Sequence, residues 1–131
     1  MYKNRYNLIC YNTYGGIDMN KYILDFLKDI MAIDSPSGYS KKVIHYCQKE
    51  AEKLGFQTKK THKGNLEIYV EGQDDYTIGF CGHVDTLGLM VRSIKSDGTL
   101  AFTNVGGPII PTLDGEYCRI HTRDGQCYTG T

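Results

Sequence analysis

The sequence predicts an α/β region followed by an all-β region. Apolar residues recur with helical spacing at 22–31 and at 40–54, in the first half of the chain. After Gly88 the pattern changes to short strands separated by tight turns, such as the turn at 96–98. The chain has 131 residues, of which 40% are hydrophobic and 23% charged, and this composition is typical of a globular protein. Disordered, collagen-like and membrane-spanning classes are therefore excluded.

The first predicted helix covers about ten residues, with Tyr22, Phe26 and Ile30 on one face and charged residues opposite. The run at 34–38 ends it, because a proline restricts the residue before it and a glycine tolerates a sharp bend. Ser40 is the expected N-cap of the second helix. Gly55 stands at the position of a left-handed residue after its C-terminus.

Two short strands are predicted next, at 56–61 and 65–71. Segment 76–84 has apolar residues without alternation, which is typical of a strand buried on both faces. His83 and Asp85 lie at the carboxyl end of this segment, where ligands gather in open α/β sheets. The all-β region then continues with strands predicted at 89–94, 99–105, 117–122 and 127–131.

Charge and cysteine content indicate the kind of partner and the compartment. Fifteen Lys and Arg balance fifteen Asp and Glu, so the net charge offers no general attraction for nucleic acid or an anionic membrane. The apolar stretches are far shorter than the roughly 20 residues that a spanning helix needs. An odd number of cysteines, five, does not indicate a disulfide framework. We expect a cytoplasmic protein with neither a nucleic-acid nor a membrane partner.

The triplet His83-Val84-Asp85 is the sharpest local feature. In an extended segment, residues two apart point to the same side. Such a pair serves as a metal ligand and the carboxylate that orients it, although a structural histidine bonded to a nearby aspartate is the simpler reading of the triplet alone. Cys81 is expected in the core, and turn or cap chemistry explains Ser35 and Ser37.

Several motifs, in order over more than a hundred residues, are much more specific than the His83-Val84-Asp85 triplet alone. They include Ile33-Asp34-Ser35-Pro36-Ser37-Gly38-Tyr39, Glu52-Lys53-Leu54-Gly55-Phe56, Lys63-Gly64-Asn65-Leu66, Gly82-His83-Val84-Asp85-Thr86-Leu87-Gly88, Ser96-Asp97-Gly98, Val105-Gly106-Gly107 and Leu113-Asp114-Gly115. With these motifs the chain, from Met19 onward, resembles the N-terminal third of the members of metallopeptidase family forty-two, the glutamyl and tetrahedral aminopeptidases.

The resemblance implies a co-catalytic pair of divalent metal ions, zinc or cobalt, in each complete subunit, acting on peptide substrates. It assigns His83 to the metal ligands and Asp85 to the catalytic residues, as the carboxylate that orients the histidine. It also implies a zinc-peptidase-like α/β domain into which an all-β, barrel-like domain is inserted, and a dodecameric homo-oligomer in the cytoplasm.

Three regions are expected: a doubtful extension at 1–18, the beginning of the α/β peptidase domain at 19–88, and an incomplete inserted β domain at 89–131. The family's other metal ligands and its catalytic glutamate follow the inserted domain. Since a catalytic zinc normally has three protein ligands, we expect the 131-residue chain alone to be inactive and not to retain the metals. Two alternatives stay open, namely a non-catalytic assembly or binding module and a glycoside hydrolase of the endoglucanase type.

Residues 1–18 precede the resemblance and have no clear period. Codons for Gly15-Gly16 can contain a purine-rich ribosome-binding sequence at a suitable distance before Met19. We therefore expect translation to start at Met19, with the preceding residues an upstream extension.

Overall fold

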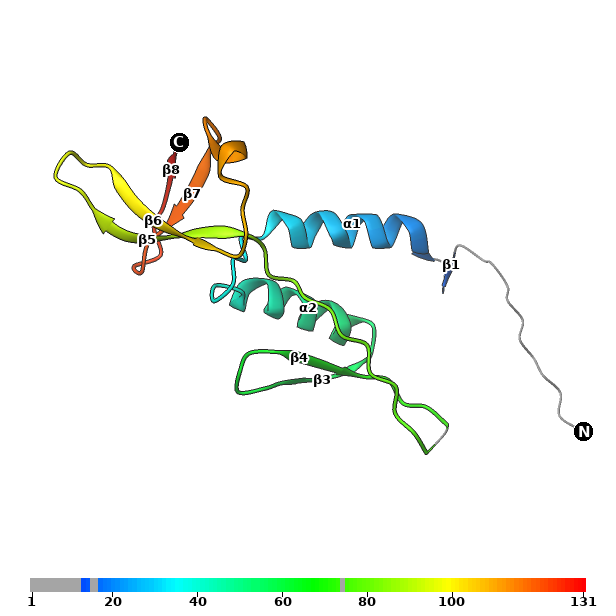
Figure 1. The fold of residues 1–131 in the computed structure, drawn as a ribbon. Helices are drawn as coiled ribbons and strands as arrows, with labels where there is room; N and C mark the ends of the chain where they lie inside the picture. The colour runs from blue at the N-terminus through cyan, green and yellow to red at the C-terminus, as the bar shows by residue number, and fades with distance from the viewer. Residues whose placement is uncertain (1–12, 15–16, 74) are drawn as a thin grey trace, which may run out of the picture. The chain divides into compact units, whose positions relative to one another are not determined.

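A computed structural model describes residues 13–14, 17–73 and 75–131 (Figure 1). Backbone contacts divide the chain into two compact units, Met1–Asp85 and Thr86–Thr131. The first unit has helices and short strands, and the second has strands and one short 3-10 helix. The chain is therefore of mixed α/β class, with antiparallel sheets. Most of the expected extension at 1–18 lies outside the described residues.

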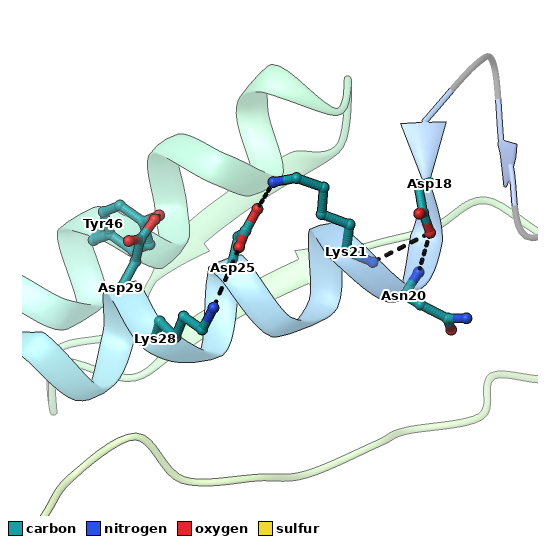
Figure 2. A network of polar contacts seen from close by, with 7 residues as sticks. All are labelled: Asp18, Asn20, Lys21, Asp25, Lys28, Asp29 and Tyr46. Carbon is teal, nitrogen blue, oxygen red and sulfur yellow. Dashed lines mark hydrogen bonds and ion pairs between the residues drawn. The ribbon is translucent and has the colours of Figure 1, made fainter.

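Helix α1 (Met19–Ala32) begins immediately after a capping residue. A two-residue strand pair, β1 (Thr13–Tyr14) with β2 (Ile17–Asp18), leads into it. The carboxylate of Asp18 accepts hydrogen bonds from the backbone N–H groups of Asn20 and Lys21, at 3.1 and 3.2 Å (Figure 2). Because this cap satisfies amide groups that a helix leaves unpaired, α1 starts about a turn earlier than apolar spacing predicts.

Helix α2 (Lys41–Lys53) contains the buried residues of the first unit's small core. Val43 is fully buried and Ala51 almost so. Ser40 is the N-cap residue, as predicted, but its side chain makes no capping hydrogen bond. Gly55 follows the helix with a positive φ of 85°, which confirms the left-handed residue expected there.

The predicted hairpin after α2 is confirmed. Strand β3 (Gln57–Lys60) pairs antiparallel with β4 (Leu66–Tyr69), and both strands contact α2 (Figure 1). Gly64 takes a positive φ of 89° in the connecting turn. The hydroxyl of Thr58 also donates to a carboxylate oxygen of Glu52 at 2.9 Å, which ties the hairpin to the helix.

The buried strand predicted at 76–84 is wrong. These residues have no regular secondary structure, and the side chains of Ile78 and Phe80 are 64% and 94% exposed. A strand buried on both faces needs neighbours on both edges, yet every sheet among the described residues is a local pair of strands. Cys81, expected in the core, is exposed for the same reason.

The second unit contains two antiparallel hairpins. In the first, β5 (Gly88–Ile94) pairs with β6 (Leu100–Val105), and the register shifts between Val91 and Ser93. A 3-10 helix, η1 (Ile110–Leu113), follows. In the second hairpin, β7 (Cys118–His121) pairs with β8 (Cys127–Gly130). The four strands predicted here are confirmed with small changes at their ends.

A closed barrel is not present in the part of the second unit that the structure describes. Its strands form two separate two-stranded sheets, whereas closure requires each edge strand to pair with a further neighbour. Among the described residues, none of the helices is both long enough and apolar enough to cross a membrane.

Candidate functional site

His83 and Asp85 contact each other directly. The Nδ1 atom of His83 lies 3.0 Å from Oδ1 of Asp85 and 3.1 Å from the backbone oxygen of the same residue. With the Nδ1 proton shared with these acceptors, the lone pair of a neutral imidazole is on Nε2. The His83 side chain is 84% exposed. The pair therefore presents one imidazole nitrogen that is suited to bind a metal ion.

The loop between α1 and α2 forms hydrogen bonds with residues 84 and 85. Ser35 is fully buried, and its hydroxyl donates to the backbone oxygen of Val84 at 3.0 Å. The hydroxyl of Ser37 donates to Oδ2 of Asp85. Turn chemistry was the whole explanation expected for these two serines, and it is incomplete. Their partners are 49 and 48 residues away, so no local pattern could have revealed them.

The environment of Asp85 favours its charged form. The hydroxyl of Ser37 is the main cause that lowers the pKa of the Asp85 carboxyl below its ordinary value, and the hydrogen bond with His83 acts in the same direction. Partial burial opposes this shift. An ionised carboxylate is the stronger acceptor for the N–H of an imidazole, so the two hydrogen bonds support the same arrangement.

The described residues do not form a complete metal centre by themselves. No group of three or more His, Cys, Asp or Glu side chains within them is placed to hold a metal ion. A histidine whose Nδ1 faces a carboxylate is the usual form of an imidazole ligand. His83 therefore fits as one ligand of a metal centre, with Asp85 behind it.

Two further histidines and a cysteine of the first unit have no hydrogen bond with His83 or Asp85. His45 is on α2 and exposed, and His62 is in the turn between β3 and β4. Cys47 is partly buried, and burial raises the pKa of its thiol, which makes it a poor nucleophile.

The sequence of the chain matches one known protein family over its second half. Residues 64–131, just over half of the chain, match the M42 glutamyl aminopeptidase family. The chain belongs to this family. The matched residues of this M42 family member include both His83 and Asp85, while Ser35 and Ser37 precede them.

Two similar curated proteins are named as aminopeptidases, which agrees with this family. YhfE of Bacillus subtilis (strain 168), named as a candidate aminopeptidase, is 38% identical over 109 residues, which cover 82% of this chain and 32% of the relative. The glutamyl aminopeptidase of Lactococcus lactis subsp. cremoris (strain MG1363) is 27% identical over 106 residues, 79% of this chain and 30% of the relative. The uncharacterised YgeY of Escherichia coli (strain K12) is 35% identical over 65 residues, 49% of this chain and 16% of the relative.

The chain is thus similar to only part of these M42 relatives. It spans about a third of the length of YhfE and of the Lactococcus glutamyl aminopeptidase.

Proposed function

We propose that this chain is part of a metal-dependent aminopeptidase that removes N-terminal residues from peptides. The contact between His83 Nδ1 and Asp85 Oδ1, 3.0 Å long and inside the range that matches the family, carries the proposal. Two relatives named for aminopeptidase activity support the same reaction class. Peptides are therefore the proposed substrates, and the proposed reaction is hydrolysis of the first peptide bond.

In this proposal His83 is a metal ligand through Nε2, and Asp85 keeps its ring in the correct tautomer and orientation. A carboxylate behind a ligating imidazole also raises the basicity of the coordinating nitrogen. Bound as a pair, divalent ions such as zinc or cobalt activate water and polarise the peptide carbonyl. Among the residues that the structure describes, His83 supplies one ligand and Asp85 its support, and no group of three or more side chains is placed to complete the centre.

The domain arrangement belongs to the same proposal. Residues 19–88 form the beginning of the α/β peptidase domain, and residues 89–131 belong to an inserted β domain that closes as a barrel in the complete protein. The complete protein assembles as a dodecameric homo-oligomer in the cytoplasm. Sedimentation velocity of the complete gene product tests the assembly, since a monomer would contradict it.

Substitution of the proposed ligand tests the function. In the complete gene product, His83→Ala should lower both aminoacyl-p-nitroanilide hydrolysis and metal affinity by more than about 100-fold, because even outer-shell partners of a ligand contribute 10 to 100-fold. His62→Ala is the matched control, since His62 is an exposed turn residue. Wild-type activity in His83→Ala, or activity on cellulose-derived substrates instead of peptides, would refute the proposal.

The isolated 131-residue chain should be inactive for a related reason. A catalytic metal ion normally needs three protein ligands, and we assign one to this chain. The purified chain is expected to release no p-nitroaniline from aminoacyl-p-nitroanilides, even with added zinc or cobalt. Measurable turnover by this chain would contradict the assignment of the remaining ligands to other residues of the complete protein.

A further inference from the structure

We propose that Ser37 is a positioning residue of the metal site, which fixes the Asp85 carboxylate and through it the ring of His83. The inference rests on the proposed function, because it concerns the same histidine. Three groups form a continuous series of hydrogen bonds: the Ser37 hydroxyl donates to Oδ2 of Asp85, and the imidazole Nδ1 of His83 lies 3.0 Å from Oδ1.

The two oxygens of Asp85 have different partners. One accepts from the serine and the other from the histidine. Rotation of the carboxylate about its Cβ–Cγ bond would break one of these hydrogen bonds or both, so the two partners together define its plane. Without the serine, Oδ2 of Asp85 would lose its side-chain donor, and the side chain of Asp85 is 39% exposed to competing water. Ser37 therefore restricts a group that solvent would otherwise leave adjustable.

The backbone of the same segment is held by the neighbouring serine. Ser35 is fully buried and donates to the carbonyl oxygen of Val84, the residue between His83 and Asp85. Pro36 separates the two serines and restricts the backbone of Ser35 to extended conformations. One short loop thus contacts both the main chain and the carboxylate of the ligand segment. This double attachment is what a pre-organised ligand requires.

A purely structural role for Ser37 makes a different prediction from a positioning role. If the serine only joined the loop to residues 84–85, its removal would lower stability and leave metal affinity unchanged. If it positions Asp85, its removal weakens metal binding, and the effect disappears when Asp85 has already been removed. The Ser37 side chain is exposed, so Ser37→Ala leaves no cavity and is expected to fold.

The experiment measures the dissociation constant for Zn²⁺ by competition with a chromophoric chelator, using the complete gene product. Ser37→Ala should bind Zn²⁺ about tenfold more weakly, at the low end of the 10 to 100-fold range for outer-shell partners. Ser37→Thr keeps the hydroxyl and should restore the affinity. Ser40→Ala is the matched control, since the Ser40 side chain makes no capping hydrogen bond. The melting temperature of each metal-free variant is recorded in parallel.

A double-mutant cycle with Asp85→Ala completes the test, with additivity as the reference. The proposal requires Ser37→Ala to have no further effect on Zn²⁺ affinity in the Asp85→Ala background. Unchanged affinity in Ser37→Ala, an equal loss in Ser37→Thr, or full additivity of the two substitutions would overturn it.

If His83→Ala binds Zn²⁺ as the wild type does, the proposed function itself fails. If His83→Ala loses Zn²⁺ and Ser37→Ala does not, only the positioning role fails.

Discussion

The phenolic hydroxyl of Tyr46 donates a hydrogen bond of 2.7 Å to Oδ2 of Asp29 and so connects α2 to α1. Figure 2 shows the two side chains between the helices. The ring of Tyr46 also stacks on that of Phe26, with 5.9 Å between the ring centroids. One aromatic side chain therefore supplies both a polar and an apolar contact between the two helices that precede the candidate site.

Removal of this hydroxyl should loosen the helix pair slightly. Tyr46→Phe keeps the ring stacking and loses the hydrogen bond, so the free energy of unfolding should fall by about 0.5–1 kcal/mol. The expected loss is small because Asp29 is exposed and water replaces the tyrosine. Urea unfolding followed by helical circular dichroism measures it. Tyr76→Phe, at a 68% exposed tyrosine, is the control and should leave the midpoint unchanged.

The same contact predicts a pH dependence. The hydrogen bond with Asp29 raises the pKa of Tyr46 well above its ordinary value of 10.0, with desolvation and the negative charge of Asp29 acting in the same direction. A raised pKa in the folded state means that the contribution to stability is complete below pH 10 and is lost progressively as the pH rises further. The stability difference between wild type and Tyr46→Phe should therefore be constant from pH 7 to about 9.5 and decrease above pH 10. A difference that grows above pH 10 would contradict the assigned contact.

The cap of α1 can be tested at Asp18. Asp18→Ala removes the acceptor for the N–H groups of Asn20 and Lys21, and should lower the free energy of unfolding by about 1 kcal/mol. Asp18→Asn retains a side-chain oxygen and should behave nearly as the wild type does. A chain that begins at Met19 lacks this cap and should match the alanine variant. Equal stability of all four proteins would show that the capping contact has no energetic role.

Gly55 is required by the backbone after α2. Its φ of 85° is strained for any residue with a Cβ atom, so Gly55→Ala should lower stability by about 1–2 kcal/mol. A Cβ at Gly55 would meet no atom within 4 Å, which excludes a steric clash as the cause. Gly72→Ala is the matched control, because its surroundings are equally open and its φ is not positive. Thermal unfolding of both variants measures the difference, and equal midpoints would contradict the conformational explanation.

Local patterns predicted the elements whose signals lie close together in the sequence. Helix α2, its glycine at position 55 and the β3–β4 hairpin depend on residues a few positions apart, and all three are confirmed. The prediction of a buried strand at 76–84 was wrong, since Phe80 is 94% exposed. Burial on two faces depends on neighbouring strands that are distant in the sequence. Local apolar composition carries no information about such neighbours.

The sequence by itself determined the candidate pair, because His83 and Asp85 are two residues apart and an extended segment lets their side chains meet. It also determined the family, through motifs that run in order along the chain. Only the tertiary structure decided what holds the pair: Ser35 and Ser37 reach Val84 and Asp85 across 49 and 48 residues. The physical reason is that a hydrogen bond depends on distance in space, and a serine in a turn motif gives no sign of a partner so far along the chain.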